Sequence, residues 1–128
     1  MADYTVKRID DMEGTFGGAF KLARAELGVT SFGMQIIDLP PNLSEGHPDH
    51  DHTESGQEEV YLVLRGAATL HVGDDDVELT PDVVAAVPAR AKRHLTTGAE
   101  GARVLALGGV PGSAYEINPT TELGASDR

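Results

Sequence analysis

The sequence contains no cysteine and no tryptophan, and its aromatic residues are limited to three Tyr and three Phe in 128 residues. Without cysteine, the chain forms no disulfide and has no thiolate for catalysis or for zinc binding. Hydrophobic residues still make up 40% of the sequence, so a core has to be built from Val, Leu, Ile and Ala. The length suits one such core, and we expect a single domain over residues 1–128.

Basic residues are also scarce, with 10 Lys and Arg against 21 Asp and Glu and a net charge of −11. This charge repels the phosphates of nucleic acids and anionic membranes, so we expect neither as a partner. No stretch approaches the roughly 18 apolar residues of a transmembrane helix, and the N-terminus shows no apolar targeting segment. We therefore expect a cytoplasmic protein.

One helix is predicted near the N-terminus, over residues about 17–27. Its apolar residues recur at helical spacing and form one stripe, which consists of Phe16, Phe20, Ala23 and Leu27. Gly28 suits a left-handed cap at the helix C-terminus. Lys21 and Arg24 lie off this stripe, so we expect them on the solvated face.

After this helix, the hydrophobic pattern changes to a period of two, which is typical of strands. Short segments rich in β-forming residues are separated by Gly and Pro turns: 29–39, 59–66, 68–73, 76–80, 82–88 and 102–109. This pattern predicts an all-β sandwich or barrel. From about residue 111 the sequence has no period, and we expect this tail to wrap the surface.

The stretch "HDHTESGQEEVYLV" combines closely spaced histidines with an acidic residue at the start of a predicted strand. In an extended backbone His50 and His52 point to the same side, and a turn at 55–56 would bring Glu59 beside them. Glu59 is in phase with Tyr61, so both side chains should face the interior. Two histidines and one carboxylate are a ligand set for iron or manganese that leaves positions open.

The same residues resemble the first motif of the cupin superfamily, in which His-x-His is followed by Glu and, after six residues, Gly. Here His50, His52 and Glu59 match, and Gly66 closes "EVYLVLRG". "PDVVAAVPARAKRH" resembles the second motif. The resemblance covers residues about 30–110, as in small single-domain bacterial cupins. It implies a double-stranded β-helix, or jelly roll, and a homodimer.

The fourth ligand position of the motif falls at the end of "PARAKRH". Counting from Pro88 places Arg93 there, and His94 comes one residue later. Because successive strand residues face opposite sides, only one of the two points inward, and the register favours Arg93. With His94 inward, the resemblance implies a site of three histidines and one carboxylate for Fe, Mn, Ni or Zn. With Arg93 inward, the metal is held by His50, His52 and Glu59 or is absent.

Further polar residues are secondary candidates. Gln57 lies an even number of residues from Glu59 and is a candidate ligand-binding residue. The alternative is a structural role in the turn. Tyr61 is expected inside, where its hydroxyl could donate a hydrogen bond to a ligand. Arg93 would offer an anion two parallel hydrogen bonds. His47 is a weaker alternative ligand in a loop, and His71 is expected at the surface.

Two classes of function fit these predictions, because the fold hosts both. The first is a metal-dependent oxygenase or isomerase acting on a small polar molecule. The second is a cupin without chemistry that binds a small anionic or sugar-like ligand without metal, or serves as a stable interaction module. No phosphate-binding loop, dinucleotide fingerprint or nucleophile elbow occurs in the sequence. A small molecule is the expected partner of both the enzyme and the ligand-binding protein.

Overall fold

The computed structural model describes residues 3–44 and 50–124. Its elements, in chain order, are η1 (Ile9–Asp11), β1 (Gly14–Thr15), β2 (Phe20–Lys21), α1 (Ala23–Leu27), β3 (Gly33–Leu39), β4 (Glu58–Val72), β5 (Asp75–Leu79), β6 (Val84–Val87), β7 (Arg93–Gly109) and η2 (Pro119–Thr121). Within the described residues, no helix is long and apolar enough to cross a membrane. The predicted all-β architecture with one short helix is confirmed.

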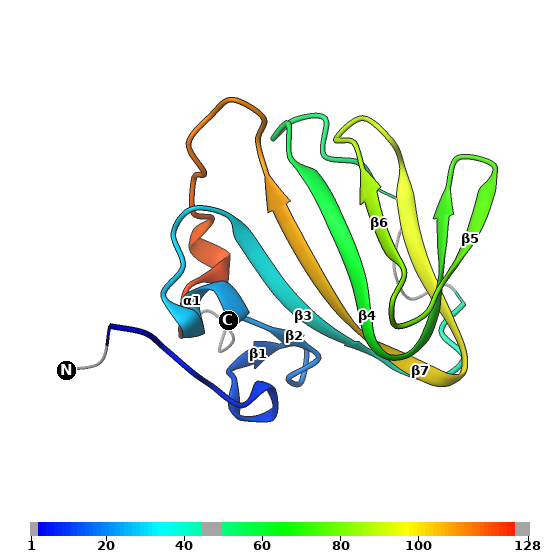
Figure 1. Cartoon of the computed structure of the whole chain (residues 1–128), viewed down its shortest axis with the longest axis horizontal. Helices are drawn as coiled ribbons and strands as arrows, with labels where there is room; N and C mark the ends of the chain where they lie inside the picture. Colours follow the sequence, from blue (N-terminus) through cyan, green and yellow to red (C-terminus); the bar gives the residue numbers. More distant parts are fainter. Residues whose placement is uncertain (1–2, 45–49, 125–128) are drawn as a thin grey trace.

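Two long strands, β4 and β7, organise the fold (Figure 1). They pair antiparallel from Glu58 opposite Gly109 to Val72 opposite Arg93, and both strands bend. One half of β4 also pairs with β6, and its other half pairs with β5. On the far side, β3 pairs with the second half of β7, and the β1–β2 hairpin extends that edge. The bend thus turns one hydrogen-bonded sheet into two facing layers.

Gly66 lies where β4 bends, between two register shifts in its pairing with β7. Its φ is +76°, in the left-handed region, and a Cβ at this position would overlap the carbonyl oxygen of Gly101. Only glycine fits both requirements without strain. The predicted strands 59–66 and 68–73 are therefore a single bent strand.

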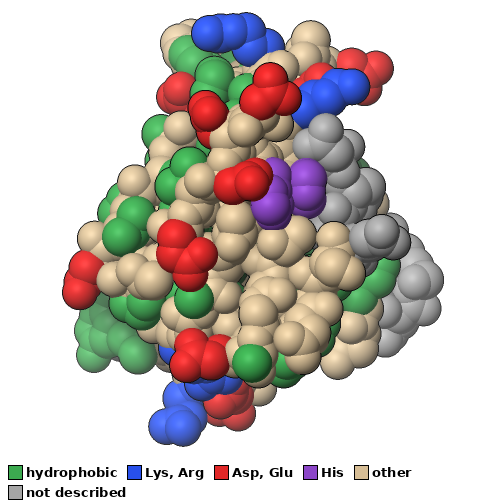
Figure 2. Space-filling model, turned by 90° about the vertical axis from the view of Figure 1, so that its right-hand side faces the viewer, with side chains coloured by type: hydrophobic (Ala, Val, Ile, Leu, Met, Phe, Trp, Pro, Cys, Tyr) green, Lys and Arg blue, Asp and Glu red, His purple; other side chains and the backbone are tan. Residues whose placement is uncertain are grey.

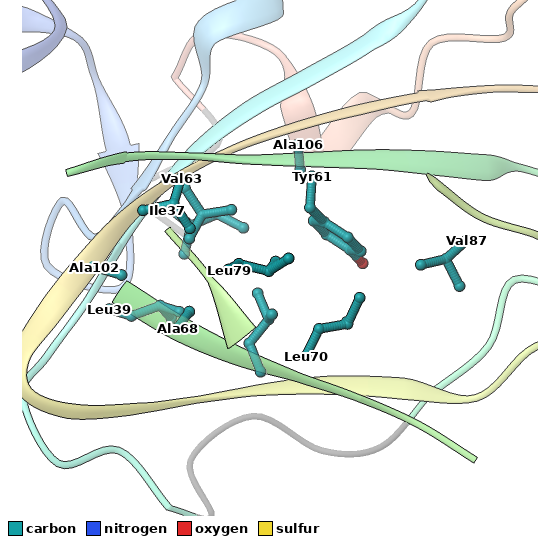
Figure 3. Packing of buried hydrophobic residues seen from close by; sticks show 12 residues of the cluster. Ile37, Leu39, Tyr61, Val63, Ala68, Leu70, Leu79, Val87, Ala102 and Ala106 are labelled. Atoms are coloured by element: carbon teal, nitrogen blue, oxygen red, sulfur yellow. The ribbon is translucent and has the colours of Figure 1, made fainter. Parts of the chain in front are cut away.

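The main core lies between the two layers (Figure 3). Alternate residues of β3, β4, β5, β6 and β7 point into it: Ile37, Leu39, Tyr61, Val63, Ala68, Leu70, Leu79, Val87, Leu95, Ala102, Val104 and Ala106. Tyr61 is the only aromatic residue among these, as the composition predicted, and its hydroxyl points toward Val87 in Figure 3. Burial of this apolar area supplies the main driving force for folding.

The predicted helix over residues 17–27 was wrong in its first half. The helix begins at Ala23, and Phe20 lies in β2 opposite Ile37. Gly17 and Gly18 have φ values of +71° and +93°, which a right-handed helix does not allow. Phe16, placed on the apolar stripe by its spacing, is 81% exposed. Pairing with β3 overrides a weak local helix pattern here.

A second, smaller core lies on the outer face of β3. Ala23 of α1 and Met12 pack there against Ile36, with Leu27 and Leu105 at the margin. Gly28 ends the helix in the left-handed conformation, as predicted. The N-terminal segment and α1 therefore cover one layer, as Figure 1 shows at its lower left.

Figure 2 shows the face at the right of Figure 1, over β5 and its neighbours. Acidic side chains are spread over its middle, while Lys and Arg lie toward its upper and lower ends. Histidine side chains are exposed beside an acidic one on this face. On this face the acidic side chains therefore do not form a single patch.

Candidate metal centre

His50 and His52 lie in an extended stretch that runs beside the start of β7. His50 forms an isolated antiparallel bridge with Arg93, with backbone N–O distances of 3.0 and 2.7 Å. The amide of His52 donates to the carbonyl of Ala89 at 2.7 Å. Residues opposite each other in an antiparallel pair point to the same side. The bridge therefore directs His50 to the face on which Arg93 lies, and His52 shares that face.

Glu59 reaches the same place from the start of β4. The turn at residues 53–56, closed by a 2.8 Å bond from the Gly56 amide to the His52 carbonyl, reverses the chain. Glu59 then faces inward with Tyr61, whose hydroxyl donates to Glu59 Oε1 at 2.7 Å. This hydrogen bond fixes the orientation of the carboxylate.

The donor atoms of His50, His52 and Glu59 all lie within 4.8 Å of one another. His52 Nε2 is 2.9 Å from Glu59 Oε1. Two ligands bound at right angles, each about 2.1 Å from one ion, would be separated by about 3.0 Å. The observed spacing of His52 and Glu59 therefore fits neighbouring positions around a divalent metal without rearrangement of the backbone.

Arg93 is fully buried on the same face and brings a positive charge close to this group. Its Nε lies 3.8 Å from Glu59 Oε1, and Nη2 donates to the Pro88 carbonyl at 3.0 Å. Within the described chain, Nε and Nη1 have no hydrogen-bond partner. Arg93 partly neutralises Glu59 and opposes the binding of a cation.

His94 lies on the opposite, outer face of β7. It pairs in register with His71, and the two rings stack with centroids 4.4 Å apart and planes 14° from parallel. Among the described residues, His94 is not part of the group that could hold a metal. This placement argues against the four-ligand set of three histidines and one carboxylate. The candidate ligand His47 lies outside the described residues.

Tyr61 is almost completely buried beside this group. Burial, with the negative charge of Glu59 as the next cause, raises the pKa of Tyr61 far above its usual range. The hydroxyl therefore keeps its proton at every physiological pH. It can donate to Glu59 but cannot act as a base.

A cavity of about 280 Å³ opens beside the candidate centre. Its lining includes His52, Glu59 and Gln57. Gln57 Oε1 lies against Gly108, where a Cβ atom would leave it too little room. Tyr61 and Arg93, the other predicted ligand-binding residues, do not line this cavity; both lie next to Glu59 instead. The volume is close to the lower end of the roughly 300–1,000 Å³ range of small-molecule pockets.

Arg24 also lines this cavity, which the sequence did not predict. It was expected on the solvated face of a helix, but it is only 4% exposed. Its partner is Glu122, at a distance of 3.0 Å and far away in the sequence. No local pattern signals a contact between the N-terminal helix and the C-terminal segment, so spacing alone could not find it.

Comparison with solved structures shows the same fold. A cupin protein from Bacteroides fragilis is 17% identical, with a TM-score of 0.65 and coverage of 92% of this chain and 93% of that chain. A sugar phosphate isomerase of the cupin superfamily from Silicibacter pomeroyi is 22% identical, with a TM-score of 0.66 and coverage of 81% and 74%.

A DMSP lyase from Ruegeria pomeroyi is 21% identical, with a TM-score of 0.56, and 73% of this chain matches 45% of the lyase. The chain thus spans less than half of that enzyme. At these identities the similarity establishes the fold alone. Comparison with curated protein sequences gives no significant match.

The sequence itself matches a family model. The match covers residues 36–108, which include β4, β5, β6 and most of β3 and β7, together with His50, His52 and Glu59. The resemblance seen in the histidine motif and the bent two-layered sheet agree with this match. The chain belongs to the cupin domain family.

Proposed function

We propose that the chain is a metal-dependent cupin enzyme in which His50, His52 and Glu59 hold a divalent cation, Fe, Mn, Ni or Zn. The observation that carries this proposal is the convergence of their donor atoms within 4.8 Å. Two histidines and one carboxylate leave coordination positions open. The substrate would be a small polar molecule in the adjoining cavity, and the reaction an oxygenation or an isomerisation.

A bound cation would supply Lewis-acid chemistry or a site for oxygen, depending on the metal. The residues of the chain prepare that site. Tyr61 holds the Glu59 carboxylate by a hydrogen bond of 2.7 Å, which keeps one oxygen aimed at His52. An ionised carboxylate only accepts hydrogen bonds, so the contact with His52 needs a proton on Nε2. A cation bound at this nitrogen would take the place of that proton, so metal binding and the present His52–Glu59 hydrogen bond exclude each other.

A second function has one specific observation in its favour. Arg93 places a buried positive charge 3.8 Å from Glu59 Oε1, where the family motif has its fourth ligand. This charge weakens the attraction of the site for a cation. The alternative is a non-catalytic cupin that binds a small anionic or sugar-like ligand without metal.

Metal analysis distinguishes these functions. The protein is purified without a histidine tag and without added metal, and its content of Fe, Mn, Ni and Zn is measured. We expect about one ion per chain for the enzyme, and titration of the metal-free protein should restore it. A protein that stays metal-free and binds none of these ions in titration would support the alternative.

We also propose a cytoplasmic homodimer. Sheet edges need cover, and the N-terminal region extends the β3 edge by the short β1–β2 hairpin. Tyr4 and Phe16 in this region are largely exposed apolar residues, which favours contact with a second copy. Light scattering should give twice the chain mass of 13.5 kDa. A monomer mass at all concentrations would exclude the dimer.

A further inference from the structure

The cavity beside Glu59 has a second charged group, Arg24 of α1. Arg24 reaches the cavity from the outer layer, and His52 and Glu59 line the same space. Only two buried arginines lie near the candidate site in the described chain, and Arg93 does not line the cavity. Arg24 is therefore the positively charged residue that a ligand in this cavity would meet.

The hydrogen bonds of Arg24 are of two kinds. Nη1 donates to the backbone carbonyl of Val29 at 2.7 Å, which fixes the guanidinium against the end of α1. Nη2 donates to Glu122 Oε1 at 3.0 Å. The Glu122 side chain is 52% exposed and follows the short η2 turn, so it can leave its position without disturbing the core. Nε is buried and has no partner within the described residues.

Glu122 belongs to a segment that closes one side of the cavity, which we call the C-terminal strap, residues 111–124. Tyr115, Asn118 and Thr121 of the strap line the cavity. The strap has an anchor that does not involve Arg24, because the Gly124 amide donates to Glu13 Oε2 at 2.6 Å. Glu122 could therefore be displaced while the strap stays attached.

We propose that Arg24 is the binding residue for the carboxylate of a small monocarboxylate ligand, and that Glu122 occupies this position until the ligand displaces it. A planar guanidinium matches a carboxylate, and a buried arginine needs such a partner at all times. The net charge of −11 favours a singly charged ligand over a dianion. The inference rests on the proposed function in one respect, that the rest of the ligand lies toward His52 and Glu59.

The side-chain Nε–H signal of Arg24 in two-dimensional ¹⁵N NMR reads this site directly. Metal-free protein is titrated with sodium butyrate, with inorganic phosphate and with butyramide, an uncharged analogue, at constant ionic strength. We expect butyrate to shift the Arg24 signal to saturation and butyramide to leave it unchanged. A site that prefers inorganic phosphate to butyrate, or binds butyramide equally well, would overturn the assignment.

Variants test the role of Glu122 as a displaceable partner. Glu122→Ala should tighten butyrate binding at least about twofold, because butyrate no longer competes with the partly exposed Glu122 carboxylate for Arg24. Glu116→Ala is the matched control, since it removes the same charge from an exposed position of the strap. Equal butyrate affinity in the two variants would contradict displacement, because a purely structural pair does not compete with a ligand.

Arg24→Met should weaken butyrate binding at least about tenfold, because charge-assisted hydrogen bonds are lost. Arg24→Lys keeps the positive charge but lacks the two parallel donors of the guanidinium. It replaces Arg24→Met if that variant does not fold, which circular dichroism checks. Unchanged butyrate affinity in a folded Arg24→Lys protein would overturn the proposal. Metal titration of the same proteins separates this proposal from the proposed metal-dependent function. If the protein binds no metal but Arg24 still binds butyrate, the carboxylate site stands and the metal site does not.

Discussion

Two clusters in this protein contain the same residue types, two histidines and one carboxylate, yet their geometry differs. In the interior cluster, His50, His52 and Glu59 point toward one place, with all donor atoms within 4.8 Å. The outer cluster consists of His71, His94 and Asp76, and its two histidine rings stack with centroids 4.4 Å apart. Composition alone would therefore assign a metal site to either cluster.

The difference lies in where the ring nitrogens point. Both nitrogens of His71 have hydrogen-bond partners, Asp76 Oδ1 at 2.6 Å and Thr96 Oγ1 at 2.8 Å. The Asp76 side chain is 71% exposed, so water screens its charge. The lone pairs of two parallel rings lie in two separate planes, and neither His71 nor His94 belongs to the group that could hold a metal among the described residues. Convergence inside the barrel, and not the number of histidines, distinguishes the candidate site.

The largest expected effect comes from removing an interior histidine. His50→Ala or His52→Ala should lower metal affinity more than about 100-fold, since loss of even a ligand's hydrogen-bond partner costs about 10- to 100-fold. His71→Ala and His94→Ala are matched controls and should retain the affinity. Calorimetric titration with Mn²⁺ measures it. Loss of binding in His94→Ala, with binding kept in His52→Ala, would reverse the comparison.

Tyr61→Phe tests whether the interior cluster depends on its hydrogen bond to Glu59. The substitution keeps the ring in the core and removes only the hydroxyl. Metal affinity should fall about 10- to 100-fold, because the carboxylate loses the donor that orients it. The same titration measures this change, and unaltered affinity would show that the 2.7 Å bond does not prepare the site.

Arg93→Met tests the charge that most distinguishes this site from the family motif. Metal affinity should rise about tenfold, because a buried positive charge near the ion is removed. Arg90→Met removes an exposed charge nearby and is the control. Weaker metal binding in Arg93→Met would indicate that the arginine positions Glu59 and does not oppose the cation.

The raised pKa of Tyr61 predicts a loss of stability in alkali. The folded protein keeps this tyrosine neutral, whereas the unfolded chain ionises it near pH 10. The pKa is raised on folding, so the contribution is complete below pH 10 and is lost as the pH rises above it. Urea unfolding at pH 8 to 11 should show a smaller loss in Tyr61→Phe than in the wild type or in Tyr4→Phe, the exposed control. Equal losses would contradict the burial argument.

The smallest effect is expected in the outer cluster. Asp76→Asn removes the charge that contacts His71, but this pair is at the surface, where ion pairs contribute about 0–1 kcal/mol. The free energy of unfolding should change by less than about 1 kcal/mol, and metal affinity should not change. A larger effect on metal binding would give the outer cluster a role that its geometry does not support.

The sequence could predict the placement of the residues in the interior cluster because a strand alternates every second residue. Parity placed Glu59 on the face of Tyr61, and counting from Pro88 placed Arg93 rather than His94 on the inner face, where the structure has it. Both inferences depend only on local backbone geometry. That these residues bind a metal or a ligand remains a prediction.

The remaining features depend on contacts between distant segments. The helix over 17–27 was predicted from spacing, yet Phe20 pairs with Ile37 of β3 and shortens the helix to Ala23–Leu27. The burial of Arg24 depends on Glu122 at the other end of the chain. Neither contact leaves a periodic signal in the sequence, so both could be found only in the folded structure.

Anomalous diffraction at the metal absorption edge tests the central claim most directly. Crystals of tag-free protein are grown with one equivalent of Mn²⁺ per chain. We predict one peak within about 2.0–2.3 Å of ligand atoms of His50, His52 and Glu59, with none at His71 and His94. A peak between the stacked histidines, or no peak in the interior at full Mn²⁺ saturation, would contradict the account.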